Sequence, residues 1–102
     1  LRFLHLQENK ITKIPQEIGR LQNLKILELG GNQISTLPSE IGKLKNLLKL
    51  NLWKNKLTQL PEEVQNLTSL TELDFVYNKL NLTPSNVAWL EKLLAQECEV
   101  CI

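Results

Sequence analysis

A repeat of 23 residues runs through the chain and limits its fold more than any other feature of the sequence. The unit at 24–46 reads LKILELGGNQISTLPSEIGKLKN. Its pattern recurs at 1–23, at 47–69 and, less regularly, at 70–92. All 4 prolines keep this register, and so does one asparagine in each unit: Asn9, Asn32, Asn55 and Asn78. A fixed period of this length indicates stacked repeats, each of which buries its apolar face only against its neighbours.

Each unit begins with an alternating apolar pattern, L-x-x-L-x-L, which predicts a short strand. Leu4, Leu27, Leu50 and Leu73 point one way, and their neighbours point the other way. Strands that recur this far apart in the sequence must be parallel and joined by crossovers. The predicted strands are 3–5, 26–28, 49–51 and 72–74.

A turn and a short helix follow each strand. The asparagine lies where the strand bends away, and an amide both donates and accepts, so stacked asparagines are expected to satisfy backbone groups that water does not reach. Proline suits the first helical position, where an N–H has no partner. A glutamate two residues later (Glu17, Glu40 or Glu63) faces the positive end of the helix. Glycine is unfavourable inside a helix, so Gly19 and Gly42 indicate that these helices are only one or two turns long.

The last unit departs from the repeat. A longer helix is expected from Pro84 to about Glu97, with Thr83 as its N-cap. Gln96 stands where a further strand would need an apolar residue, so we expect the sheet to end at the fourth strand. One helical face is predicted to be buried, including both cysteines: Val87, Leu90, Leu94, Cys98 and Cys101. We expect two overlapping parts, the repeats at 1–93 and a terminal cap at 84–102.

These residues resemble the leucine-rich repeat family. The resemblance rests on L-x-x-L-x-L-x-x-N and on LPSEIGKLKNL at 37–47, a variant of the repeat that is common in bacterial and plant intracellular members. It implies an α/β fold: a right-handed horseshoe solenoid with a parallel sheet on the concave face and short helices on the convex face. The sequence departs from the family pattern at Gln65, Phe75, Thr83 and Asn86.

The resemblance also implies that the chain binds another protein or a peptide through its concave face. The repeated leucines are expected to be buried, so specificity should lie at the variable positions of the strands and turns. Trp53 and Tyr77 are the expected anchors, because aromatic groups ringed by charges are typical of protein-binding surfaces. The opposing interpretation is that single exposed apolar residues are ordinary. The predicted binding face comprises Phe3, His5, Ile26, Glu28, Gly30, Lys49, Asn51, Trp53, Lys54, Glu72, Asp74, Val76 and Tyr77.

A notch is also expected in this face. Gly30 and Gly31 fall in the two columns where the next unit carries Trp53 and Lys54. Two missing side chains beside an indole would leave room for a side chain of the partner.

Catalysis is not predicted. His5 is the only histidine, and the stacking of strands keeps it far from Cys98 and Cys101. The C-x-x-C formed by these cysteines lacks the second ligand pair of a zinc site and the context of a redox site. Glu28 and Asp74 share a column, but no insertion forms a cleft around them. We therefore expect no enzyme activity, cofactor or metal.

The bulk properties restrict the partners. The net charge of +1 gives no field that favours nucleic acid, and no apolar run reaches the length of a membrane span. The sequence starts inside a repeat at Leu1 without a methionine, so we expect a longer parent protein, with the cytoplasm favoured over export. Two alternatives remain open: the recognition part of a larger ligase, kinase or GTPase, and self-association through the open strand edge at Leu1.

Overall fold

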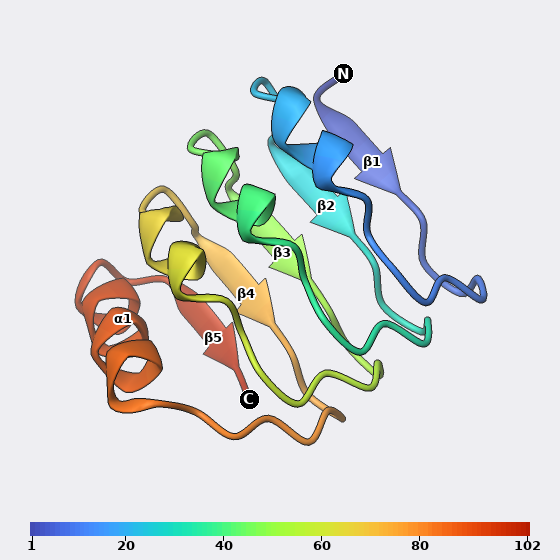
Figure 1. Cartoon of the computed structure of the whole chain (residues 1–102). Helices are drawn as coiled ribbons and strands as arrows, with labels where there is room; N and C mark the ends of the chain where they lie inside the picture. The colour runs from blue at the N-terminus through green and yellow to red at the C-terminus, as the bar shows by residue number, and fades with distance from the viewer.

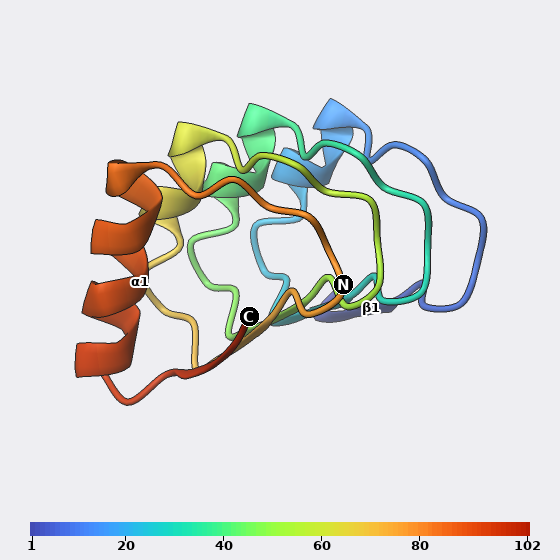
Figure 2. The same ribbon diagram turned by 90° about the horizontal axis from the view of Figure 1, so that it is seen from below.

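The computed structural model describes residues 1–102 as an α/β right-handed solenoid. Five parallel strands form one sheet in chain order (Figure 1). The sheet lines one side and the helices line the other, so each unit forms one turn of the solenoid (Figure 2). The strands are β1 (Phe3–His5), β2 (Ile26–Glu28), β3 (Lys49–Asn51), β4 (Glu72–Asp74) and β5 (Glu99–Cys101).

The central residue of each strand stacks on its equivalent in the next strand. Leu4, Leu27, Leu50 and Leu73 are in register, and the last three of these are almost completely buried. The flanking residues point outward, as expected for a strand with one face on a core. The first four strands have the predicted boundaries, which confirms that the repeat period sets the sheet register.

The prediction that the sheet ends at the fourth strand was wrong. β5 pairs with β4 in parallel, and Val100 takes the place opposite Leu73. The sequence pattern missed β5 because the last crossover is longer than the others. A helix of 12 residues replaces a helix of 5 residues there, so the next strand comes later than the repeat predicts.

Three short 3-10 helices form the convex side: η1 (Gln16–Arg20), η2 (Ser39–Lys43) and η3 (Glu62–Asn66). Each has 5 residues, in agreement with the expected length. The prediction that proline is the first residue of these helices was wrong. The prolines lie one position earlier, in extended conformation, where the carbonyl oxygen of Pro15 accepts a hydrogen bond from the Ile18 N–H.

Gly42 lets adjacent 3-10 helices approach closely. A Cβ at this position would lie 2.5 Å from the carbonyl oxygen of Glu63 on η3. The corresponding residue of η3 is Gln65, which is exposed. Gln65 replaces the glycine of the family pattern. A longer α-helix, and not another 3-10 helix, follows η3, so the close approach seen at Gly42 is not repeated there.

The helix α1 (Pro84–Ala95) covers the C-terminal end of the solenoid. Pro84 begins it, and Thr83 caps it as predicted. The Thr83 hydroxyl accepts from the Asn86 N–H at 3.1 Å, and the Asn86 side chain accepts from the Thr83 N–H at 3.1 Å. In this reciprocal capping box, Asn86 takes the position at which glutamate or glutamine is usual.

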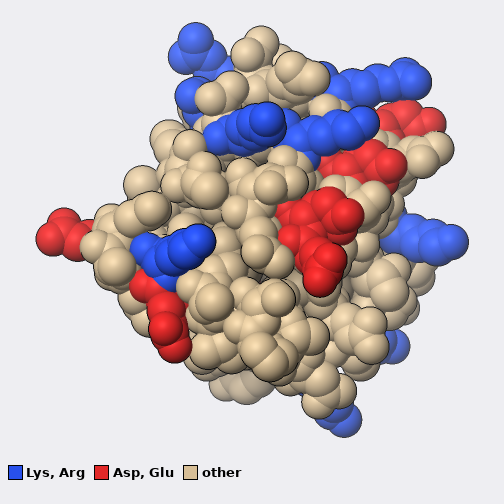
Figure 3. All heavy atoms as spheres, turned by 60° about the vertical axis from the view of Figure 1, so that its left-hand side comes forward, with Lys and Arg blue, Asp and Glu red and all other residues tan.

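The predicted buried face of this helix was wrong in part. Val87 and Leu94 are 42% and 57% exposed, and Cys101 lies outside the helix, exposed in β5. The indole of Trp89 is buried instead and donates to the Leu67 carbonyl at 3.3 Å. The observed buried face comprises Asn86, Trp89, Leu90 and Leu93. Figure 3, which views this end, shows a largely uncharged surface with lysine and arginine side chains grouped at the top and carboxylates grouped to the right of centre.

A single core of 22 buried residues runs through the stack. Its largest fully buried side chains all lie between Leu24 and Leu73, in the units with a neighbour on both sides. Leu4, Leu6 and Ile11 of the first unit are only partly buried. Burial thus comes from stacking, as the repeat architecture requires.

The asparagine ladder joins the turns of successive units. The Asn55 amide nitrogen donates to the carbonyls of Leu29 and Leu52, both at 3.0 Å. Its carbonyl oxygen accepts from the Ile34 N–H at 3.1 Å. Asn32 and Asn78 repeat this pattern one unit before and one unit after. Each amide therefore satisfies backbone groups of its own turn and of the preceding unit.

Replacing Asn55 by alanine should lower the free energy of unfolding by about 2–4 kcal/mol, because buried backbone groups of two units lose their partners. Asn9 is the matched control. It is exposed and bonds only to the carbonyls of Leu6 and Gln7 within its own unit, so Asn9→Ala should cost less than about 1 kcal/mol. Urea unfolding followed by circular dichroism measures both. Equal losses in the two variants would contradict the role of the ladder.

Candidate binding face

The outward side chains of the strands form two columns on the concave side. The first holds Phe3, Ile26, Lys49, Glu72 and Glu99, and the second holds His5, Glu28, Asn51, Asp74 and Cys101. Apolar groups lie toward β1, where Phe3 is exposed, and carboxylates gather toward β5. Glu99 and Cys101 were missing from the predicted face because β5 was not predicted. Val100 and Ile102, spaced like Leu73 and Phe75, were the only sequence signal for this strand.

Lys49 connects three strands at the centre of the face. Its ammonium lies 3.1 Å from a Glu28 carboxylate oxygen on β2 and 3.5 Å from one of Glu72 on β4. The hydrogen bond to Glu28, the charge of Glu28 and then the charge of Glu72 raise the pKa of Lys49 above its usual value. These residues, chosen separately from the sequence, thus form one charged group.

A hollow of about 240 Å³ lies beside this group, between β3 and β5. Its lining includes Leu50 and Leu73 together with polar residues of three strands: Lys49, Asn51, Glu72, Asp74, Glu99 and Cys101. Asp74 accepts a hydrogen bond from the Val76 N–H at 3.0 Å. The Leu50 and Leu73 side chains are almost completely buried in the core, so the hollow is a polar depression floored by strand backbone.

The turn after each strand adopts the left-handed conformation at one position. The φ angles are 57° at Glu8, 72° at Gly31, 53° at Lys54 and 61° at Tyr77. The N–H of each of the first three donates to a carbonyl of the next unit, at 2.7–2.9 Å. The stacking thus holds non-glycine residues in a conformation that they rarely adopt, and Tyr77 is presented on a fixed turn.

Trp53 and Tyr77 come together at these turns. Their ring centroids are 6.0 Å apart with an interplanar angle of 76°, an edge-to-face contact. The Lys54 ammonium lies 5.9 Å from the centroid of the Trp53 ring. Tyr77 is 70% exposed, while Trp53 is partly buried. A hollow of about 650 Å³ adjoins Tyr77 on the outer side of the turns.

The expected notch at Gly30 and Gly31 is filled. Gly30 is buried, and a Cβ there would lie 3.3 Å from the Trp53 carbonyl oxygen. The Glu8 carboxylate lies across Gly31, so close that a Cβ on Gly31 would be 2.6 Å from its oxygen. These glycines therefore serve the close packing of the turns, and Gly30 offers no side chain to a partner.

The remaining predicted residues are spread along the sheet. His5 is on β1 and Cys101 on β5, four strand spacings apart, which is roughly 19 Å. Glu28 and Asp74 are separated by Asn51 on the strand between them. No group of three or more histidine, cysteine, aspartate or glutamate side chains is placed to hold a metal ion. None of the helices is long and apolar enough to span a lipid bilayer.

The two cysteines differ in environment, although both were predicted to be buried. Both are free thiols; Cys98 is buried and Cys101 is exposed. Burial, followed by the charges of Glu72 and Glu99, raises the pKa of the Cys98 thiol. Cys98 is therefore a packing residue between the helix and the last strand.

The comparisons with known proteins agree with this architecture. A family model described as the leucine-rich repeat region matches residues 1–95. A solved leucine-rich repeat protein from Leptospira interrogans is 42% identical over 100% of this chain, with a TM-score of 0.85. This chain spans 25% of the length of that protein. No curated protein matches the sequence.

The chain therefore belongs to the leucine-rich repeat family. A leucine-rich repeat domain implies, in general terms, a protein-interaction module.

Thiol alkylation should distinguish the two cysteines. At neutral pH, iodoacetamide should modify Cys101 at least about tenfold faster than Cys98, because a buried thiol of raised pKa is less accessible and less often a thiolate. Peptide mass spectrometry of the native protein measures both rates, and the same reaction in guanidinium chloride should remove the difference. Equal rates in the native protein would contradict the observed burial of Cys98.

Proposed function

We propose that the chain binds another protein through its concave strand face and the adjoining turns, with Trp53 and Tyr77 as anchors. The observation that carries the proposal is the aromatic pair, which is held edge to face on hydrogen-bonded turns and left largely uncovered at Tyr77. The convex helices are less suitable, because the hollow between η1 and η2 has no hydrophobic lining residue.

The pair is suited to binding because its position is already determined before a partner arrives. The Lys54 N–H donates to the Val76 carbonyl at 2.9 Å, and the Asn51 side chain accepts from the Trp53 N–H at 2.9 Å. Rigid aromatic side chains contribute large contact area at small entropic cost on association. Surrounding polar groups then set the orientation of the partner.

The double variant Trp53→Ala, Tyr77→Ala should lose binding while it keeps the fold, because neither residue belongs to the buried core. The probe is a set of peptides selected from a displayed random library on the wild-type protein. Their dissociation constants should rise at least about thirtyfold in the double variant, which corresponds to about 2 kcal/mol.

The matched control is Val87→Ala, Leu94→Ala, which removes two exposed apolar side chains from α1, away from the sheet. This variant should bind the peptides as the wild type does. Fluorescence anisotropy gives the affinities, and far-ultraviolet circular dichroism checks the fold. Unchanged affinity in the aromatic variant would overturn the proposed binding site.

A further inference from the structure

We propose that the partner segment carries a basic side chain next to its apolar one, and that this lysine or arginine enters the acidic hollow between β3 and β5. The inference rests on the proposed concave-face function and names the chemistry of the partner.

The first argument is the charge of the sheet face. Its strand residues include one ammonium, that of Lys49, and four carboxylates: Glu28, Glu72, Asp74 and Glu99. The strand face thus has a formal charge of −3, although the chain as a whole carries +1. Charges of the opposite sign are therefore concentrated on the rest of the surface. A partner that docks on the strands meets a negative face, and a positive segment complements it.

The second argument is that the free protein leaves part of this negative charge uncompensated. Lys49 pairs with Glu28 and Glu72, whereas Asp74 and Glu99 form no ion pair within the chain. Glu72 and Glu99 are register partners on adjacent strands. Like charges directly opposite each other destabilise a sheet. A cation between β4 and β5 relieves this repulsion, so binding gains energy that no neutral side chain supplies.

The third argument is the shape of the hollow. The hollow of about 240 Å³ is floored by the backbone of β3 and β4, because Leu50 and Leu73 are buried, and carboxylates of β4 and β5 border it. Lysine and arginine have long stems that reach across this floor, past the exposed Cys101, while the charged head stays among carboxylates. An acidic side chain is repelled by these carboxylates, and a purely aliphatic side chain leaves them unpaired.

The spacing between the hollow and the aromatic pair sets the partner motif. Trp53 follows Asn51, which lines the hollow, by two residues, and Tyr77 follows Asp74 by three residues. Two residues of a strand span roughly 7 Å. In an extended segment that runs along the strands, side chains two positions apart lie on one face at this distance. The partner motif is therefore a basic residue and an apolar residue separated by one position.

The test uses the peptides selected from the random library on the wild-type protein. They should be enriched in lysine or arginine two positions from an aromatic or aliphatic residue. Their affinity should fall at least about tenfold in the variant Glu72→Gln, Asp74→Asn, Glu99→Gln. Asp74 accepts a hydrogen bond from the Val76 N–H, and Asn51 accepts the equivalent bond from the Trp53 N–H in the preceding unit. Asparagine at position 74 should therefore keep the turn intact. Binding should also weaken as salt shortens the Debye length from about 10 Å at 0.1 M to about 3 Å at 1 M.

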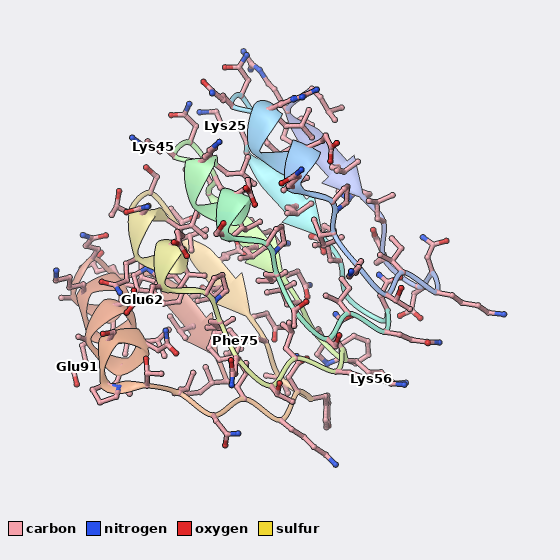
Figure 4. The ribbon with its side chains drawn as sticks, in the orientation of Figure 1. Lys25, Lys45, Lys56, Glu62, Phe75 and Glu91 are labelled. Carbon is pink, nitrogen blue, oxygen red and sulfur yellow. The ribbon has the colours of Figure 1, made fainter.

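The matched control removes the same number of charges from the helices. Glu17, Glu62 and Glu91 are exposed there and make no ion pair, and Figure 4 shows Glu62 and Glu91 on η3 and α1. The variant Glu17→Gln, Glu62→Gln, Glu91→Gln should bind the peptides with wild-type affinity. An equal loss in this control would show that net charge alone drives binding and would overturn the inference.

The remaining outcomes separate the inference from the proposed function. Peptides that depend on Trp53 and Tyr77 but show no basic residues and no response to the acid-removing variant overturn the inference and leave the proposed function standing. Peptides that bind the aromatic double variant as tightly as the wild type overturn both the inference and the proposed function. Light scattering covers the last alternative, since a dimer that the acid-removing variant dissociates would assign the face to a second copy of this chain.

Discussion

The stack of asparagine amides is the interaction on which the remainder of the structure depends. Each unit must turn sharply after its strand, and the turn leaves backbone groups that neither a helix nor a sheet satisfies. Asn32, Asn55 and Asn78 satisfy them across the junction between units, with donors and acceptor of the same amide. The leucines supply the driving force for stacking, but they do not specify direction. The amide bonds restrict the register, because they connect fixed positions of adjacent turns.

This separation of roles shapes the surface. Core leucines and ladder asparagines recur, and the side chains between them are free to differ. In this chain the variation is ordered along the sheet, from Phe3 and Ile26 through the Lys49 group to the carboxylates beside β5. The left-handed turns place Tyr77 against Trp53 at the edge of the same surface. The columns of outward side chains are a consequence of the repeat, whereas the chemistry of those side chains is not.

The C-terminal end shows where periodic reasoning stops. The N-cap at Thr83 could be predicted from the residues, because it depends on local contacts alone. The buried side of α1 could not, because Trp89 rather than Val87 or Leu94 meets the last repeat. β5 was missed for a related reason, since its pairing depends on the length of the crossover and not on the period. Glu99 lies on the candidate binding face only because of that pairing.

The sequence alone determined the units, the strand boundaries of β1–β4, the asparagine row and the columns of outward residues. It could do so because these features follow from local conformation repeated at a constant interval. The tertiary structure decided which outward residues touch: Lys49 with two carboxylates, Trp53 with Tyr77, and Glu8 over Gly31. It also placed a fifth strand beside β4 and left Cys101 exposed while burying Cys98. Side-chain contacts of this kind depend on the spacing and curvature of stacked units, which no single stretch of sequence encodes.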